Sequence, residues 1–354
     1  MSSAPPTIAD LRIGVVGAGL IGGSVIRRAL AAGCATLVHD EDPAATAAAA
    51  ALGATAGRLD EVIAGSDLVV LALAPAEAGR LWGRVATAAG APPGSTGRAD
   101  APRTLFLDVA SVKSPVVAAV EASDATWSTT SELLVLTHPM AGREASGWPA
   151  SDPGLFEAAA WTVSPTATMT GRELARILAF IDGMGAHACF IDAGFHDRFA
   201  AVVSHLPHVL SFALRSLVEQ EDPAGAWRTF AGGSLQDMLR ISDSNEHLWS
   251  EVFSANREEL KRLATKLHAL AEHSIAADPA GLADMRSADR APRSRTTPPP
   301  AATGPVQTFP LDAAIGAAAT GLAGTAERGL EVGSWTVRSG TDLQLTLVRR
   351  EDRG

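Results

Sequence analysis

The 354-residue sequence is 47% hydrophobic and 19% charged, with a formal net charge of −10, which predicts about two globular domains and excludes a disordered chain. The negative charge argues against a general nucleic-acid binder, because Lys and Arg are not in the excess needed to neutralise phosphates. Two cysteines, Cys34 and Cys189, provide neither a disulfide framework nor a CxxC metal pair.

The N-terminal stretch has no basic segment followed by an apolar one, so it does not resemble a signal peptide. No apolar run is expected to approach the roughly 20 residues that span a bilayer. We therefore expect a cytoplasmic protein that works without a membrane or a nucleic-acid partner.

Short apolar segments alternate with helical patterns over the first half of the chain. Residues 11–16 are predicted as a buried strand because they are short, β-branched and followed by glycine. A helix then ends at Gly33, and Pro43 and Gly53 mark the ends of a second helix. Strands that are apolar on both faces and alternate with helices predict a parallel sheet covered on both sides. Further strands are expected within residues 35–40, 67–75, 104–111, 133–139, 159–165 and 186–192, with a loop insertion at 91–103.

Helical spacing dominates residues 193–276. We expect a long final helix that is capped by Asp243, with Glu246 three residues on. An i, i+4 pair of Glu258 and Arg262 supports this helix. Its apolar stripe fits either plain core or a dimer interface. The stripe consists of Leu248, Val252, Leu260, Leu263, Leu267 and Leu270.

The remaining chain is predicted as a linker and a small tail. Residues 277–305 are rich in Pro, Ala and charge, which is typical of a flexible linker. Residues 311–323 fit a helix, and 333–339 with 343–350 fit a hairpin, but this tail is too short for an independent domain with a good core. The predicted fold is α/β: a Rossmann-like, mainly parallel sheet domain over 9–192, an all-helical domain over 193–276, and a small αβ appendage over 306–354.

A glycine loop follows the first predicted strand and opens the first helix. Gly17, Gly19 and Gly22 match GxGxxG in the strand–turn–helix context that dinucleotide binding requires. Asp40 ends the second strand, where an acid accepts hydrogen bonds from ribose hydroxyls, and no arginine lies nearby to meet a 2′-phosphate. The cofactor is therefore predicted as NAD in preference to NADP. The predicted cofactor residues are Gly17, Gly19, Leu20, Ile21, Gly22, Asp40, Ala74 and Pro75.

Two strand ends carry polar residues that suit chemistry. His138 ends a buried strand within "THPMAGREASG" and fits either a satisfied histidine at a turn or a catalytic base. Ser111 and Lys113 follow another strand, at the edge where open α/β sheets bind ligands. Ser111 fits a helix cap equally well.

The helical half carries a second polar cluster. "HDRFAAVVSHLPH" (196–208) holds three histidines, for which structural, substrate-binding and metal-binding roles are open, although HxxH without an acid or cysteine at ligand spacing is a weak zinc signal. Asp197, Ser204 and His208 fall near one helical face, and Pro207 predicts a kink or a wet notch. Arg240 suits either a carboxylate ligand or a surface ion pair.

Taken together, these segments resemble the prephenate/arogenate dehydrogenase family of tyrosine biosynthesis. The resemblance spans residues 11–275, and the HPMAG and SHLPH segments are its most specific parts. The segments that carry it are 14–24, 108–113, 137–147, 196–208 and 239–249.

The resemblance implies oxidative decarboxylation of prephenate to 4-hydroxyphenylpyruvate, with hydride passing to NAD. It implies that His138 is the base and that Ser111 orients this histidine or the substrate hydroxyl. Arg240 would hold a carboxylate and His208 would contact the substrate's carboxylate or side chain. Trp249 would close the pocket, and Ser204 is assigned to the substrate site. The resemblance implies a homodimer through the helical domain and no metal.

Three alternatives remain open. An arogenate dehydrogenase uses the same site on a substrate with an amino group in place of the keto oxygen. A β-hydroxyacid dehydrogenase needs a lysine on the second-domain helix, and residues 193–240 contain none. A nonenzymatic NAD-binding sensor would bind cofactor without turnover. No chorismate mutase segment precedes the glycine loop, so we expect a monofunctional enzyme, and the tail is not clearly a tyrosine-sensing domain.

Overall fold

Eight strands form one sheet in the amino-terminal part of the computed structural model, which describes residues 6–74, 77–78, 81, 104–122, 134–284, 306–316, 318–325, 330–338 and 341–349. The strand order is β3-β2-β1-β4-β5-β6-β7-β8, and neighbouring strands are parallel except for the antiparallel pair β6 and β7. The prediction of a mainly parallel, Rossmann-like sheet is confirmed. The strands are β1 (Ile13–Val16), β2 (Thr36–His39), β3 (Thr55–Ala56), β4 (Leu68–Leu71), β5 (Leu105–Asp108), β6 (Leu134–Pro139), β7 (Ala160–Ser164) and β8 (His187–Phe190).

Helices cover this sheet, and local sequence signals explain where they begin and end. The side chain of Asp42 accepts a hydrogen bond from the amide of Ala44, and Pro43 occupies the first turn of α2. Gly53, with φ of +109°, follows the end of that helix, as predicted. Thr170 and Glu173 form a capping box at the start of α7. The helices are α1 (Leu20–Ala31), α2 (Pro43–Ala51), α3 (Leu59–Gly65), α5 (Ser114–Glu121) and α7 (Gly171–Gly183).

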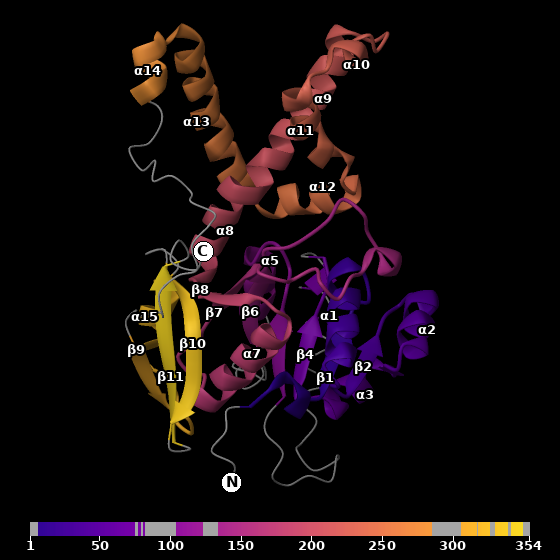
Figure 1. Cartoon of the computed structure of the whole chain (residues 1–354), viewed down its shortest axis with the longest axis vertical. Helices are drawn as coiled ribbons and strands as arrows, with labels where there is room; N and C mark the ends of the chain where they lie inside the picture. Colours follow the sequence, from indigo (N-terminus) through magenta and orange to yellow (C-terminus); the bar gives the residue numbers. More distant parts are fainter. Residues whose placement is uncertain are drawn as a thin grey trace.

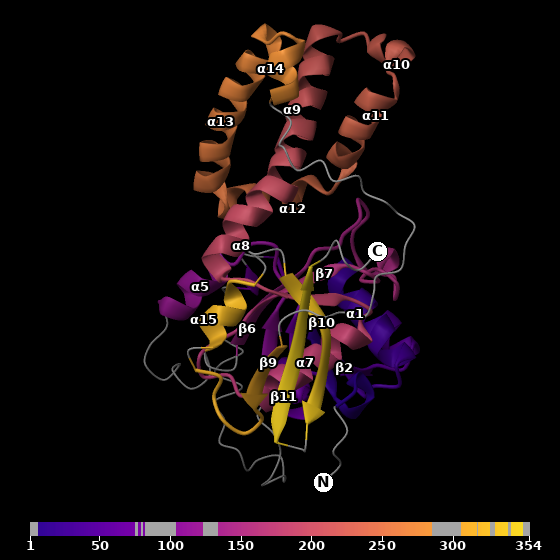
Figure 2. The same ribbon diagram turned by 60° about the vertical axis from the view of Figure 1, so that its left-hand side comes forward.

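The helical part begins directly after β8 and extends away from the sheet (Figures 1 and 2). Its first helix continues through a π-helical turn at Ala201–His205 before α9 starts. The elements are α8 (Ala193–Ala200), the π-turn, α9 (Leu206–Glu221), α10 (Trp227–Phe230), α11 (Gly233–Arg240), a 3₁₀ turn (Ile241–Asp243), α12 (Glu246–Ala255), α13 (Arg257–Ala276) and α14 (Pro279–Asp284).

The prediction of one long final helix capped by Asp243 is wrong. Asn245 caps α12 by accepting a hydrogen bond from the amide of Leu248, and Asn256 separates α12 from α13. Arg262 pairs with Glu259 at i, i+3, not with Glu258 as predicted. The break arises because Asn256 is buried and its side chain bonds other elements, a constraint that sequence periodicity does not carry.

The run from α8 to α9, Ala193–Glu221, corrects a second expectation. It is a 29-residue helical span with a mean hydropathy of 1.3 over its most apolar window, which is long and apolar enough to cross a membrane by length and composition alone. It also contains the buried polar residues His196, Asp197 and His205, which are hydrogen-bonded within the molecule.

The tail forms a second, three-stranded sheet in the order β10-β11-β9 (yellow in Figure 1). The predicted hairpin is confirmed by the antiparallel pairing of β10 (Leu330–Arg338) with β11 (Asp342–Arg349). The predicted helix is shorter, α15 (Ala318–Ala323), and the strand β9 (Val306–Pro310) was not expected. Helix α14 lies inside the segment that we expected to be a flexible linker.

This tail packs on α7 and shares the core of the first domain. Buried apolar residues of the tail belong to one hydrophobic cluster with those of the main sheet and α7. The amide of Arg172 donates to the carbonyl of Leu311, and a Cβ at Gly171 would overlap the carbonyl of Pro310. The tail is therefore a packed layer of the molecule and has no separate core. Its buried residues include Phe309, Leu311, Ile315, Leu322, Leu343, Leu345 and Leu347.

Candidate active site

The glycine loop connects β1 to α1 with the geometry that a bound dinucleotide needs. Gly17 has φ of +93°, and a Cβ there would overlap the carbonyl of Ala72. A Cβ at Gly22 would overlap the carbonyl of Gly17, which explains the close approach of α1 to the turn. Gly19 faces open space, so a ligand can approach the backbone at the start of α1.

A cavity of about 440 Å³ opens beside this loop at the carboxyl ends of β1, β2 and β4. Asp40 lines it and is held by hydrogen bonds from the amide of Ala18 (2.5 Å) and the amide of Asp42 (2.7 Å). Gly17, Gly19 and Ala74 line the same cavity, whereas Pro75 and the 91–103 insertion lie outside the described residues. No Lys or Arg is among the described lining residues. The glycine backbone, the helix N-terminus and Asp40 fit the pyrophosphate and ribose of NAD.

His138 lies in β6 at the same edge of the sheet, two strands from β4. Its backbone pairs with Thr162 of β7, and Pro139 ends the strand. The side chain is only 8% exposed. Among the described residues, its Nε2 atom has no hydrogen-bond partner, whereas Nδ1 is bonded.

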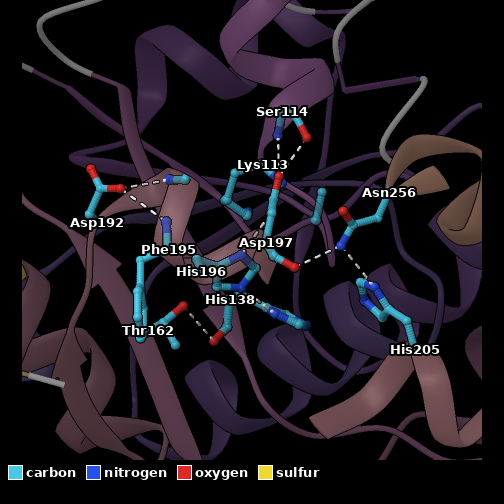
Figure 3. A network of polar contacts seen from close by, with 12 residues as sticks. Lys113, Ser114, His138, Thr162, Asp192, Phe195, His196, Asp197, His205 and Asn256 are labelled. Carbon is cyan, nitrogen blue, oxygen red and sulfur yellow. Dashed lines mark hydrogen bonds and ion pairs between the residues drawn. The ribbon is translucent and has the colours of Figure 1, made fainter. Parts of the chain in front are cut away.

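The bonded nitrogen of His138 begins a chain of polar contacts (Figure 3). Nδ1 of His138 lies 3.0 Å from Nε2 of His196, and Nδ1 of His196 lies 2.9 Å from Oδ1 of Asp197. Asp197 also accepts hydrogen bonds from the amide of Lys113 (2.8 Å), the amide of Ser114 (2.8 Å) and Oγ of Ser114 (2.5 Å). Sequence reasoning missed His196 as a partner of His138. The only available signal was a His-Asp pair immediately after the last strand.

The residues after β5 are arranged differently from the prediction. Lys113 does not face the cofactor or substrate: it is 1% exposed, pairs with Asp108 and donates to the carbonyl of Thr137 at 2.7 Å. Ser111 is not the cap of α5, since this helix begins at Ser114 and Asp197 bonds its first amides. Ser111 is half-buried three residues beyond β5, the strand that pairs with β6. Ser111 and His138 therefore follow neighbouring strands at one edge.

The predicted effect of Pro207 takes the form of a π-turn over Ala201–His205, without a described wet notch. Proline cannot donate the helical hydrogen bond, and π-turns frequently occur at functional sites. Nδ1 of His208 donates to the carbonyl of Ser204 at 2.9 Å, so Ser204 contributes its backbone. The ring of His208 stacks on Trp249 with a centroid separation of 3.5 Å. The structure thus brings Ser204, His208 and Trp249 together.

Arg240 bridges the helical part and the loop after His138. Its guanidinium pairs with Glu144, and its side chain is 63% exposed. Nearby, the amide of Asn245 contacts Oγ of Ser146 at 3.3 Å. The charges of Glu144 and Arg240 both influence the pKa of His208, whose net lowering is due mainly to burial. Arg240 is therefore close to the His208–Trp249 stack, with an exposed head that can exchange partners.

Burial keeps the central histidines neutral. It lowers the pKa of His138 well below 6.5, and nearby His196, Lys113 and His205 act in the same direction. Burial also lowers the pKa of His196, and it lowers that of His205 to about 4. A neutral His138 can accept a proton at pH 7. Within the described part of the chain, no group of three or more His, Cys, Asp or Glu residues is arranged to hold a metal ion.

Two family models match this sequence. The one described as the prephenate dehydrogenase nucleotide-binding domain matches residues 25–190. The one described as the prephenate dehydrogenase dimerization domain matches residues 192–276. Together they cover the eight-stranded sheet and the helices up to α13.

Known proteins share this similarity. A prephenate dehydrogenase of Lactococcus lactis subsp. cremoris is 34% identical over 160 residues, 44% of this chain but only 41% of that protein. A candidate prephenate dehydrogenase from Corynebacterium glutamicum has a similar structure, with 30% identity, a TM-score of 0.61 and coverage of 74% of this chain and 80% of that one. The Aquifex aeolicus prephenate dehydrogenase, crystallised with hydroxyphenyl propionate and NAD⁺, shares the fold at 24% identity and a TM-score of 0.61, over 74% of this chain and 88% of that one.

Proposed function

The chain belongs to the prephenate dehydrogenase family, and from that premise we propose that it catalyses the NAD-dependent oxidative decarboxylation of prephenate to 4-hydroxyphenylpyruvate. The observation that carries the proposal is the unpartnered Nε2 atom of the buried, neutral His138, among the described residues, at the same sheet edge as the dinucleotide cavity. Similar proteins that bind hydroxyphenyl propionate and NAD⁺ support it.

His138 is proposed to hold the substrate's hydroxyl proton during the reaction. NAD, held by the glycine loop and Asp40, supplies the hydride acceptor for the ring carbinol carbon. As hydride leaves, His138 Nε2 accepts the hydroxyl proton, and Ser111 orients the hydroxyl or the histidine. The bond to the ring carboxylate breaks, CO₂ departs, and its electron pair makes the ring aromatic. The resulting phenolate oxygen takes the proton back from His138, so no net proton remains on the enzyme.

The helical domain is proposed to hold the substrate's carboxylates. The exposed guanidinium of Arg240 exchanges Glu144 for a substrate carboxylate, since a planar fork suits bidentate binding. His208 contacts the pyruvyl side chain or its carboxylate, and Trp249, stacked on His208, closes the pocket. Ser204 positions His208 through its carbonyl.

Arogenate is the alternative substrate, because it differs from prephenate by one substituent far from the reacting carbon. A β-hydroxyacid substrate is less favoured, since residues 193–240 contain no lysine, and Lys113 is buried in an ion pair. An NAD-binding sensor without turnover would leave the neutral His138 without a task.

The test is to measure NADH formation with prephenate and with arogenate, each with NAD and with NADP. We expect the highest kcat/KM with prephenate and NAD. A large arogenate preference would replace the substrate assignment, and preferred use of NADP would overturn the role of Asp40. Cofactor binding without turnover of either acid would favour the sensor.

The enzyme is also proposed to be a cytoplasmic homodimer joined through the helical domain. The name of the matching model supports this assembly, as do several exposed apolar side chains, while free Cys34 and Cys189 suit a reducing compartment. We propose no nucleic-acid or membrane partner. The exposed apolar residues include Leu217, Phe230, Met238, Leu270 and Ile275.

A further inference from the structure

We propose that Asp197 and His196 are positioning residues that fix the proton of His138 on Nδ1 and thereby direct its Nε2 lone pair to the substrate hydroxyl. The inference rests on the proposed function of His138 as the base and extends it to two residues of the next domain. Three side chains from β6 and α8 form the chain shown in Figure 3.

The proton positions follow in order from Asp197. Three protein donors other than histidine point at its carboxylate, namely the amides of Lys113 and Ser114 and the hydroxyl of Ser114. Burial alone would raise its pKa, but the hydrogen bonds from His196, Lys113 and Ser114 hold the pKa of Asp197 below its ordinary value. Asp197 is therefore an anion that only accepts, and the proton between Asp197 and His196 belongs to Nδ1 of His196.

The rest of the chain follows from the chemistry of neutral imidazole. A neutral ring carries one N–H and one lone pair. Since His196 uses its N–H for Asp197, its Nε2 accepts, and Nδ1 of His138 must donate across the 3.0 Å contact. His138 then keeps its lone pair on Nε2, the atom with no hydrogen-bond partner in the described part of the chain.

The surrounding residues hold this chain in place. Lys113 binds Asp108 and the carbonyl of Thr137, the residue before His138. Asn256 donates to the carbonyl of Asp197 and contacts Nδ1 of His205 at 3.2 Å. The groups whose charge reaches His138 or His196 are Lys113, Asp108, Asp197 and His205. When His138 takes the proton, the anionic Asp197 stabilises the positive charge through His196, as a carboxylate does in a catalytic triad.

The decisive variant is Asp197→Asn. If the amide nitrogen of Asn faces His196, it donates to Nδ1, moves the His196 proton to Nε2, and forces His138 to carry its proton on Nε2. The base then has no lone pair for the substrate. We expect kcat to fall on the order of 10²–10⁴-fold with little change in KM. The acid limb of the kcat profile should move to lower pH, because the charge that favours protonated His138 is lost.

A second pair of variants separates this role from the cap that Asp197 gives to α5. His196→Leu leaves the cap intact but removes the acceptor for His138, and we expect a loss of at least about 10²-fold in kcat. His196→Gln retains an amide oxygen that can accept from Nδ1 of His138, and should recover part of that loss. Asp192→Asn is the matched control, because Asp192 caps the same helix through Gly194 and Phe195 and does not touch the chain.

Histidine tautomers can also be read without turnover, by ¹⁵N NMR of the selectively labelled protein with His138→Asn and His196→Leu for assignment. Protons on Nδ1 of both rings support the proposal, and a proton on Nε2 of His138 overturns it. Variants that keep kcat within about threefold of wild type also overturn it. If the wild-type protein turns over neither acid, the proposed function fails, while the tautomer measurement still decides the proton positions.

Discussion

At the scale of single residues, the histidines of this chain differ because their surroundings differ. His138 and His205 are both buried, yet Nδ1 of His138 contacts another imidazole, whereas Nδ1 of His205 contacts the amide of Asn256. His208 is half-buried and stacked on Trp249. Residue type alone therefore does not assign a role. The atoms that each ring bonds determine whether it can act as a base, a contact or a support.

Replacing His138 by Asn tests the base directly. Asparagine is a poor proton acceptor, so kcat should fall on the order of 10²–10⁴-fold while the NAD dissociation constant stays near the wild-type value. Steady-state kinetics and a cofactor titration measure the two quantities. His247→Asn is the control, because the His247 side chain is 86% exposed on α12. Turnover that survives in the His138 variant would remove this residue from the chemistry.

The buried histidines also predict how stability depends on pH. Burial lowers the folded-state pKa of His138 and His196, and that of His205 to about 4, whereas an unfolded histidine titrates near 6.5. Below pH 6.5 the unfolded chain binds more protons, so the free energy of unfolding falls from that pH down to about 4, by roughly 3 kcal/mol for His205. Urea unfolding across this range should show the loss, and His205→Gln should flatten it. A pH-independent free energy would contradict neutral burial.

At the scale of elements, the joins between helices and strands create the site. The π-turn places the His205 and His208 side chains around Pro207, and the break at Asn256 lets this side chain reach Asp197 and His205. The cap of α5 comes from α8, a different element of the fold. These joins depend on contacts between residues 51 to 84 positions apart, so local patterns could not indicate them.

The tail sheet is expected to stabilise the first domain, because its apolar residues complete that domain's core. Leu345 is fully buried in β11, and Leu345→Ala should lower the free energy of unfolding by about 2–5 kcal/mol through lost burial and a cavity. Chemical denaturation measures this change. Gln344→Ala, at the neighbouring and partly exposed position, should have a small effect. Equal effects of the two variants would show that the tail does not support the core.

At the scale of the whole molecule, the site is shared between two parts of the chain. The sheet supplies the glycine loop, Ser111 and His138, and the helical part supplies His196, Asp197, His208 and Arg240. Direct contacts hold the parts together near the reacting atoms, including His138 with His196 and Glu144 with Arg240. Movement of the helical part would therefore change both substrate binding and the base.

The proposed dimer makes a prediction at this scale. Leu270 of α13 is 52% exposed in the single chain, and Leu270→Glu would place a charge in an apolar interface, which is costly to bury. Light scattering should then report a shift from dimer toward monomer. Leu52→Glu is the control, since Leu52 is 50% exposed on the first domain. A wild-type monomer, or a Leu270 variant that remains fully dimeric, would contradict this interface.

The sequence by itself determined the features that short-range chemistry controls. Alternating buried strands and helices predicted the parallel sheet, GxGxxG with Asp40 predicted the dinucleotide cavity, and His138 was recognised at a strand end. These features depend on backbone sterics and hydrophobic periodicity within a few residues. The roles of Ser111, His208 and Arg240 came from family resemblance and stay proposals.

Tertiary structure alone decided which groups meet. It placed His196 and Asp197 behind His138, buried Lys113 in an ion pair, divided the last helix at Asn256 and packed the tail on α7. Each outcome requires side chains distant in sequence to satisfy a hydrogen bond or bury apolar surface together. A polar residue in the sequence shows that a partner is needed, but only the fold shows which partner it finds.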